Sequence, residues 1–313
     1  MNEKNKKLSY YMQDFGALIA LMILVIGIGI ISPQFRTVNN FFSLLRQSSI
    51  NGLIAFGMTF VILTGAIDLS VGSLLALSTA ICAGLIKGGM PAALAMVISL
   101  LLGAALGFIS GILVTKGRLQ PFIATLITMT VYRGVTMIYT NGKPISGLGD
   151  SNILRVIGKG DLFGIPVPVI LLFVMFIIFY FLLNKTTFGR RIYATGSNAK
   201  AAKLAGVNIS RTKILVYVIS GIMSALAGLI LLSRLNSAQP TLGTGYELDA
   251  IAAVALGGTS MNGGRGKIYG TLIGVLIIAV LNNGLNILGV SSYYQDVIKG
   301  LVILIAVLSD RKR

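Results

Sequence analysis

The chain has 313 residues, of which 55% are apolar and only 11% are charged, against about 25% charged residues in soluble globular domains. This composition excludes a soluble enzyme or binding module and predicts an all-α polytopic membrane protein. The chain has no histidine and one cysteine, which excludes histidine metal sites and an intrachain disulfide. We expect no metal and no cofactor.

Apolar runs of about 20 residues, the length that crosses ~30 Å of hydrocarbon, recur along the chain. They predict ten spans, at residues 16–32, 45–66, 70–86, 91–115, 121–140, 166–184, 213–233, 248–261, 268–288 and 294–309. All seven prolines fall at the ends of these runs or between them, as expected because proline is costly inside a helix. We therefore expect residues 1–313 to form one transmembrane domain, with a first helix that is retained.

The basic residues predict the orientation. With the N-terminus inside, seventeen lysines and arginines fall on the inner side of the membrane and seven on the outer side. Because cytoplasmic loops are enriched in basic residues, both termini are expected in the cytoplasm. The same rule accounts for the net charge of +17, so no nucleic-acid partner is expected.

Two apolar runs, one in each half of the chain, are interrupted by glycine and polar residues. They are LTGAIDLSVGS at residues 63–73 and ELDAIAAVALGGTSMNGG at residues 247–264. Paired interruptions are typical of transporters built from internal repeats, in which discontinuous helices lie beside the pathway. We therefore predict discontinuous helices and an internal repeat. Glycines in GMTFVILTG and SALAG also indicate close helix packing.

Polar side chains within the spans are the candidates for lining a translocation pathway, because such groups are costly in a membrane and usually face a cavity or a partner. They are Gln47, Asn51, Asp68, Ser70, Thr128, Arg133, Asn282, Asn283 and Asn286. Alternatives remain open for each. Asp68 can instead cap the third helix together with Ser70, Arg133 can pair with an acid such as Asp68 or extend to the surface, and the others can bond neighbouring helices.

The stretch ATGSNAKAAKLAGVNISRTK, at residues 194–213, is too polar to enter a bilayer and belongs to a basic segment at residues 184–213. Within it, Ser197 or Asn198 can cap a short helix that Gly206 ends. A helix of about two turns is marginal alone, so a partner is expected to hold it. The candidate docking residues are Ser197, Asn198, Ala199, Lys200, Ala201, Ala202, Lys203, Leu204, Ala205 and Gly206, with an apolar face formed by Ala201, Ala202, Leu204 and Ala205. The alternative is a solvated basic loop that packs on its own protein or on anionic lipid.

The run KAAKLAG, at residues 200–206, resembles the E-A-A-x-x-x-G loop of permease subunits of binding-protein-dependent ABC importers. Lys200 stands in place of the glutamate, and Ile219 in place of a proline that many members have. The blocks LIAFGMTFVILTGAIDLSVGSLLALS, TTFGRRIYATGSN and GRGKIYGTLIGVLIIAVLNNGLNILGVSSYYQDVIKG resemble the ribose-type branch of monosaccharide permeases. The resemblance extends from about Asn39 to the C-terminus.

This resemblance implies a subunit of the bacterial plasma membrane that forms the pathway for a monosaccharide, with ribose as the expected sugar. It also implies three protein partners: an ABC ATPase subunit that docks at the loop, an extracytoplasmic sugar-binding protein, and a second permease subunit, expected to be another copy of this chain. Alternating access would be driven by ATP on the ATPase. The run GGRGKI at residues 263–268 lacks the first glycine and the hydroxyl residue of a P-loop, so this chain is not expected to bind ATP itself.

Two other functions have recognisable sequence requirements. An ion-coupled secondary transporter needs embedded carboxylates, and Asp68 is the acid most clearly surrounded by apolar sequence. A membrane-embedded enzyme needs a convergent catalytic set, and the sequence offers none.

Overall fold

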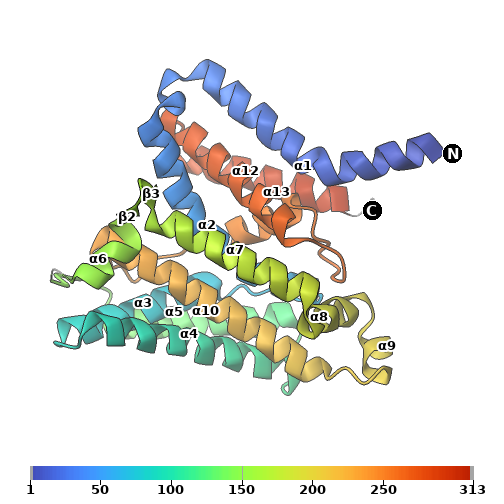
Figure 1. Ribbon diagram of the computed structural model, residues 1–313. Coiled ribbons are helices and arrows are strands. Elements are labelled where there is room, and N and C mark those ends of the chain that lie inside the picture. The colour runs from blue at the N-terminus through green and yellow to red at the C-terminus, as the bar shows by residue number, and fades with distance from the viewer. Residues whose placement is uncertain (1–2, 150, 311–313) are drawn as a thin grey trace.

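The computed structural model describes residues 3–149 and 151–310, and the side chains of residues 16–149, 151–305 and 308. Ten helices coincide with the ten predicted spans, which confirms the all-α fold (Figure 1). They are α1 (Glu3–Ile31), α2 (Val38–Leu63), α3 (Val71–Lys87), α4 (Ala92–Thr115), α5 (Pro121–Thr140), α7 (Val167–Lys185), α10 (Ile209–Leu235), α11 (Tyr246–Leu256), α12 (Ile268–Ile287) and α13 (Ser292–Asp310).

Five of the described helices are long and apolar enough to cross a membrane: α4, α5, α7, α10 and α12. Shorter apolar stretches lie at Gly16–Ile31 and Val71–Lys87. The eighth predicted span, residues 248–261, was too long. Its helix, α11, has 11 residues and a length of about 16 Å, roughly half of the hydrocarbon layer. The helix ends at Leu256 because Gly257 and Gly258 follow it, the second with a positive φ of 79°.

The smaller elements lie in the connections. The 3-10 helix η1 (Pro33–Arg36) joins α1 to α2. Between α5 and α7 lie β1 (Ile145–Ser146), α6 (Asn152–Lys159), β2 (Asp161–Leu162) and β3 (Ile165–Pro166), and the polar segment after α7 forms α8 (Thr187–Ser197) and α9 (Ala199–Leu204). The strand β4 (Ser237–Ala238) pairs antiparallel with β1, and β2 pairs antiparallel with β3.

Helix α10 is the centre of the bundle and packs against α2, α3 and α4. Glycines allow these helices to approach closely. A Cβ atom at Gly107 of α4 would clash with the carbonyl of Tyr217, and one at Gly57 of α2 would lie 2.9 Å from the Cα of Ser220. A Cβ atom at Gly228, in the SALAG run, would clash with Thr79 of α3. The close packing expected from these glycines is confirmed.

Each half of the chain contains the same sequence of elements: a long helix, a non-helical break and a shorter helix. In the first half these are α2, residues 64–70 and α3, and in the second half α10, residues 236–245 and α11. Discontinuous helices are therefore present, and the first break lies where the sequence predicted an interruption. The second break, at residues 236–245, precedes α11, whereas the sequence placed it within residues 247–264, which form α11 and part of the connection that follows it. An internal repeat stays a prediction.

Candidate functional site

The first break, residues 64–70, is non-helical backbone in the interior of the bundle. Such backbone is tolerated at membrane depth only where protein or water satisfies its polar groups. Here the carbonyl of Ile67 accepts hydrogen bonds from the hydroxyls of Tyr217 on α10 (3.2 Å) and Thr125 on α5 (3.3 Å). The conformation of the break therefore depends on side chains from two distant helices.

Asp68 in the first break is fully buried. Its Oδ1 atom accepts hydrogen bonds from the backbone N–H (3.0 Å) and the hydroxyl (2.6 Å) of Ser70, and its Oδ2 atom accepts one from the Ser220 hydroxyl (2.8 Å). The sequence left open that Asp68 acts at the start of the third helix together with Ser70, and the structure contains this bond to Ser70 at the start of α3. Through the bond from Ser220, the same carboxylate also connects the start of α3 to α10. A direct role of Asp68 and Ser70 in transport stays a prediction.

The second break, residues 236–245, is held by Arg133 of α5. Its Nη1 atom donates hydrogen bonds to the carbonyls of Pro240 (2.7 Å) and Leu242 (2.9 Å). The pairing of Arg133 with Asp68 that the sequence allowed was wrong, because each of these side chains bonds other groups. Arg133 instead supplies the donors that this stretch of embedded backbone needs.

We expect the change Arg133→Met to lower the thermal stability of the purified chain. It leaves two carbonyls without their donor, and a hydrogen bond from a charged group contributes about 1.5–3 kcal/mol. The midpoint of thermal unfolding should fall by roughly 4–8 °C. The control is Thr130→Val on the same helix, whose hydroxyl bonds only the Leu126 carbonyl at an exposed position. An equal shift in both variants would contradict this role of Arg133.

The two breaks meet where the short helices begin. A Cβ atom at Gly72, in the first turn of α3, would clash with the carbonyl of Gly243 and would lie 2.7 Å from the carboxylate of Glu247. Glu247 also accepts a hydrogen bond from the Gly245 N–H (3.3 Å) at the start of α11. The N-termini of α3 and α11, which carry the positive ends of the helix dipoles, are therefore adjacent, with one carboxylate near each.

The asparagines of α12 lie in contacts between helices. Asn283 and Asn40 exchange two amide hydrogen bonds (3.0 and 2.8 Å), and Asn286 accepts one from Gln295 of α13 (2.9 Å). Asn282 is buried, and its side-chain oxygen has no partner in the described part of the chain. Asn283 and Asn286 thus bond neighbouring helices, which was the alternative to lining the pathway. Their role in transport stays a prediction.

The remaining candidates do not form one cluster with these. Thr128 is buried, donates to the Thr125 carbonyl (3.1 Å) and accepts from Ser110 of α4 (3.3 Å). Asn51 is buried on α2, and Gln47 is exposed one turn earlier. The site that the structure does bring together consists of Asp68, Ser70 and Arg133 around the two breaks.

Four residues that hold the breaks were not predicted from the sequence. Ser220 and Tyr217 of α10 donate hydrogen bonds to the first break, and Gly72 and Gly243 lie where the two breaks touch. Gly243 could have been found, because glycine inside a break is a signal of close backbone approach. The hydroxyls lie in an apolar run in which nothing distinguishes them from other helix-packing residues.

The candidate docking helix is α9. The Asn198 side chain accepts a hydrogen bond from the Ala201 N–H (3.0 Å), and Gly206 follows the helix with a positive φ of 84°. All the candidate docking residues are exposed except Ala202. The predicted four-residue apolar face was therefore wrong in part. Ala202 is turned toward the protein, whereas Leu204 is 91% exposed and projects into solvent.

Helix α8 contacts the end of α2, directly before the first break, and the connection after α11 through what we call the glycine junction, formed by Leu63, Gly196 and Gly264. The Gly264 N–H donates to the carbonyl of Leu63 (2.9 Å), the last residue of α2. A Cβ atom at Gly196 would clash with both groups. Beside it, the Tyr193 hydroxyl of α8 donates to the carbonyl of Gly266 (2.8 Å). Burial raises the pKa of Tyr193, so the hydroxyl keeps its proton at neutral pH.

The chain matches one family model, described as branched-chain amino acid transport system / permease component, over residues 40–307. It is 60% identical to the ribose import permease protein RbsC of Bacillus subtilis (strain 168), over 96% of this chain and 94% of that protein. It is 50% identical to RbsC of Escherichia coli (strain K12), over 97% and 95%, and 40% identical to the L-arabinose transport system permease protein AraH of the same strain, over 95% and 90%. No solved structure matches the chain.

Proposed function

Because this chain belongs to the family described as branched-chain amino acid transport system / permease component, we propose that it is the permease subunit of an ATP-driven importer of ribose. The observation that carries the choice of sugar is sequence identity. The two ribose permeases are 60% and 50% identical to this chain over nearly its whole length, whereas the arabinose permease is 40% identical.

The chain is a transport subunit and not an enzyme, and the energy comes from ATP hydrolysis on a separate ABC ATPase subunit. We place the docking site of that subunit on α8 and α9, the coupling segment within residues 184–213. Leu204 supports this placement, because a 91% exposed leucine on a short polar helix is suited to an apolar pocket on a partner. Exposed cations of the same segment, such as Arg190 and Lys203, would surround that contact.

We further propose that both termini and the coupling segment lie on the cytoplasmic side of the bacterial plasma membrane. The described ends of α1 and α13 lie at the side of the bundle that carries α8 and α9 (Figure 1). The excess of basic residues predicted for that side supports the orientation. An extracytoplasmic sugar-binding protein would then approach the opposite side, where β2 and β3 lie, and a second copy of this chain would complete the pathway.

Within the subunit, we place the pathway beside the meeting point of the two breaks. Motion of the ATPase would reach this point through the glycine junction, since Leu63 directly precedes the first break and Gly264 lies in the connection after α11. The breaks would then change position together as the subunit alternates between its inward-open and outward-open states.

The test is uptake of labelled ribose by cells that lack their own ribose importer and express this chain with its ATPase and binding protein. We expect uptake that stops when ATP is depleted and that unlabelled ribose suppresses more strongly than unlabelled arabinose. Uptake that survives ATP depletion but stops with an ionophore would favour an ion-coupled secondary transporter. Stronger suppression by arabinose would show that ribose is not the preferred sugar, and the ATP-driven mechanism would still hold.

A further inference from the structure

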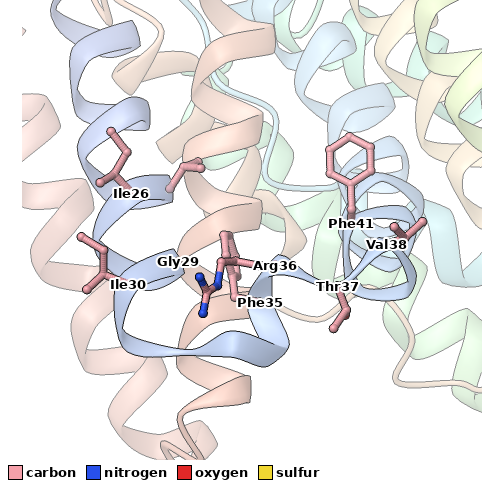
Figure 2. A pocket seen from close by; sticks show the side chains of 9 residues that line it. Ile26, Gly29, Ile30, Phe35, Arg36, Thr37, Val38 and Phe41 are labelled. Carbon is pink, nitrogen blue, oxygen red and sulfur yellow. The ribbon is translucent and has the colours of Figure 1, made fainter.

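A groove of about 560 Å³ lies between the end of α1 and the start of α2, where η1 joins them (Figure 2). Its walls are almost entirely apolar and include Ile26 and Ile30 of α1, Phe35 of η1, and Val38 and Phe41 of α2. Several of these side chains are largely uncovered by protein, with exposed fractions of 54% for Ile26, 69% for Val38 and 56% for Phe41. In a membrane permease the apolar stretch Gly16–Ile31 of α1 would face hydrocarbon, and an acyl chain could then enter this groove from the side.

Arg36 places a cation at the mouth of the groove. It is the last residue of η1, and its Cγ atom lies 3.9 Å from the position that a Cβ atom of Gly29 would occupy. The aliphatic part of the arginine therefore lies in van der Waals contact range of α1 at Gly29. Figure 2 shows the guanidinium reaching toward α1 on the groove side of the turn. No described acidic side chain forms an ion pair with Arg36.

The turn that carries Arg36 marks a membrane surface. It joins α1 to α2 and contains Gln34 and Thr37, both exposed, and Asn39 in the first turn of α2 is exposed as well. An exposed cation at this level, directly beside an apolar groove, matches the two parts of a phospholipid: a phosphate at the surface and an acyl chain below it. An anionic headgroup is favoured over a zwitterionic one, because none of the residues that line the groove is acidic and could bind an amine.

We propose that this groove is a binding site for an anionic phospholipid, with one acyl chain between α1 and α2 and its phosphate paired with Arg36. The lipid would fill the space between the first two membrane helices. The site is separate from the breaks and does not depend on which sugar is transported.

The chain contains no tryptophan, so a single introduced tryptophan reports on one place only. The reporter is Phe41→Trp in the groove, and the matched control is Phe173→Trp on α7, where the phenylalanine is similarly exposed, at 49%. The full chain is reconstituted in bilayers that contain a small fraction of phospholipid brominated on its acyl chain. Quenching by brominated phosphatidylglycerol is compared with quenching by brominated phosphatidylcholine.

For Phe41→Trp we expect apparent binding of phosphatidylglycerol about fivefold stronger than that of phosphatidylcholine, the ratio that corresponds to ~1 kcal/mol for one basic residue at an anionic surface. The ratio should be about one for Phe173→Trp, and adding Arg36→Gln to Phe41→Trp should reduce it to about one. If Phe41→Trp fails to fold, Val38→Trp serves as the reporter. Equal ratios in the groove and on α7, a ratio unaffected by Arg36→Gln, or a groove tryptophan that neither lipid quenches would each overturn the proposal, the last because another protein chain would then cover the groove.

Discussion

Replacing Gly196 with alanine should lower ATP-driven uptake at least tenfold while the ATPase stays bound. The added Cβ atom would clash with the Leu63 carbonyl and the Gly264 N–H, two groups that bond each other. Overpacking of this kind costs about 1–3 kcal/mol, and 1.4 kcal/mol is a tenfold change in an equilibrium. Because backbone cannot rotate away as a side chain can, α8 would separate from the end of α2. Uptake and ATPase co-purification are measured on the same membranes.

The control for this variant is Gly134→Ala on α5, where an added Cβ atom would meet nothing within 4 Å. It should retain wild-type uptake. A milder change, Tyr193→Phe, removes only the bond from α8 to the Gly266 carbonyl and should lower uptake roughly two- to tenfold, since one neutral hydrogen bond contributes about 0.5–1.5 kcal/mol. Normal uptake by both Gly196→Ala and Tyr193→Phe would contradict transmission through the glycine junction.

Replacing Leu204 with aspartate should remove the ATPase from the purified complex. A central apolar contact of an interface contributes 2 kcal/mol or more, so we expect binding to weaken by roughly 30-fold. The new carboxylate would also be buried without a partner in any apolar pocket that now receives the leucine. The fold should be unaffected, because Leu204 is 91% exposed and the bond that caps α9 comes from Asn198. The measurement is the amount of ATPase that co-purifies with the tagged chain.

Phe163→Asp provides the matched control. Phe163 is 96% exposed between β2 and β3, at the end of the bundle opposite α9 (Figure 1). It undergoes the same change from apolar to acidic and should leave ATPase binding intact. Retention of the ATPase by Leu204→Asp, or its equal loss from both variants, would show that the partner does not dock on this leucine.

Local signals predicted most of the fold. Apolar length and proline positions located ten helices that overlap the predicted spans, five of them long and apolar enough to cross a membrane. The cap of α9 and its glycine end could be read from Asn198 and Gly206, because those interactions join residues close in sequence. The length of α11 was overestimated because its glycine-rich end remains apolar enough to resemble a continuing span. The pairing of β1 with β4 could not be predicted, because it joins Ile145 to Ala238 through contacts that only the folded bundle creates.

The site was predicted less well for the same reason. Sequence placed Asp68 and Arg133 correctly within interrupted or embedded segments, yet their partners lie far along the chain: Ser220 is 152 residues from Asp68, and Pro240 is 107 residues from Arg133. The local sequence also could not predict which face of α9 is turned toward the protein. Its alanines and leucine are equally apolar, and Ala202 is the one that faces inward because α9 packs against α8 and α10.

The donors to the first break have a consequence for biosynthesis. Tyr217 is made 150 residues after Ile67, which takes a ribosome roughly 8–30 s at 5–20 residues per second. During that interval the polar break lacks the hydrogen bonds from α10, so the insertion of α3 in the lipid is less stable. We expect the first hairpin to remain at the insertion machinery, or with a membrane chaperone, until α10 arrives. Chains truncated before α10 should therefore be degraded rapidly.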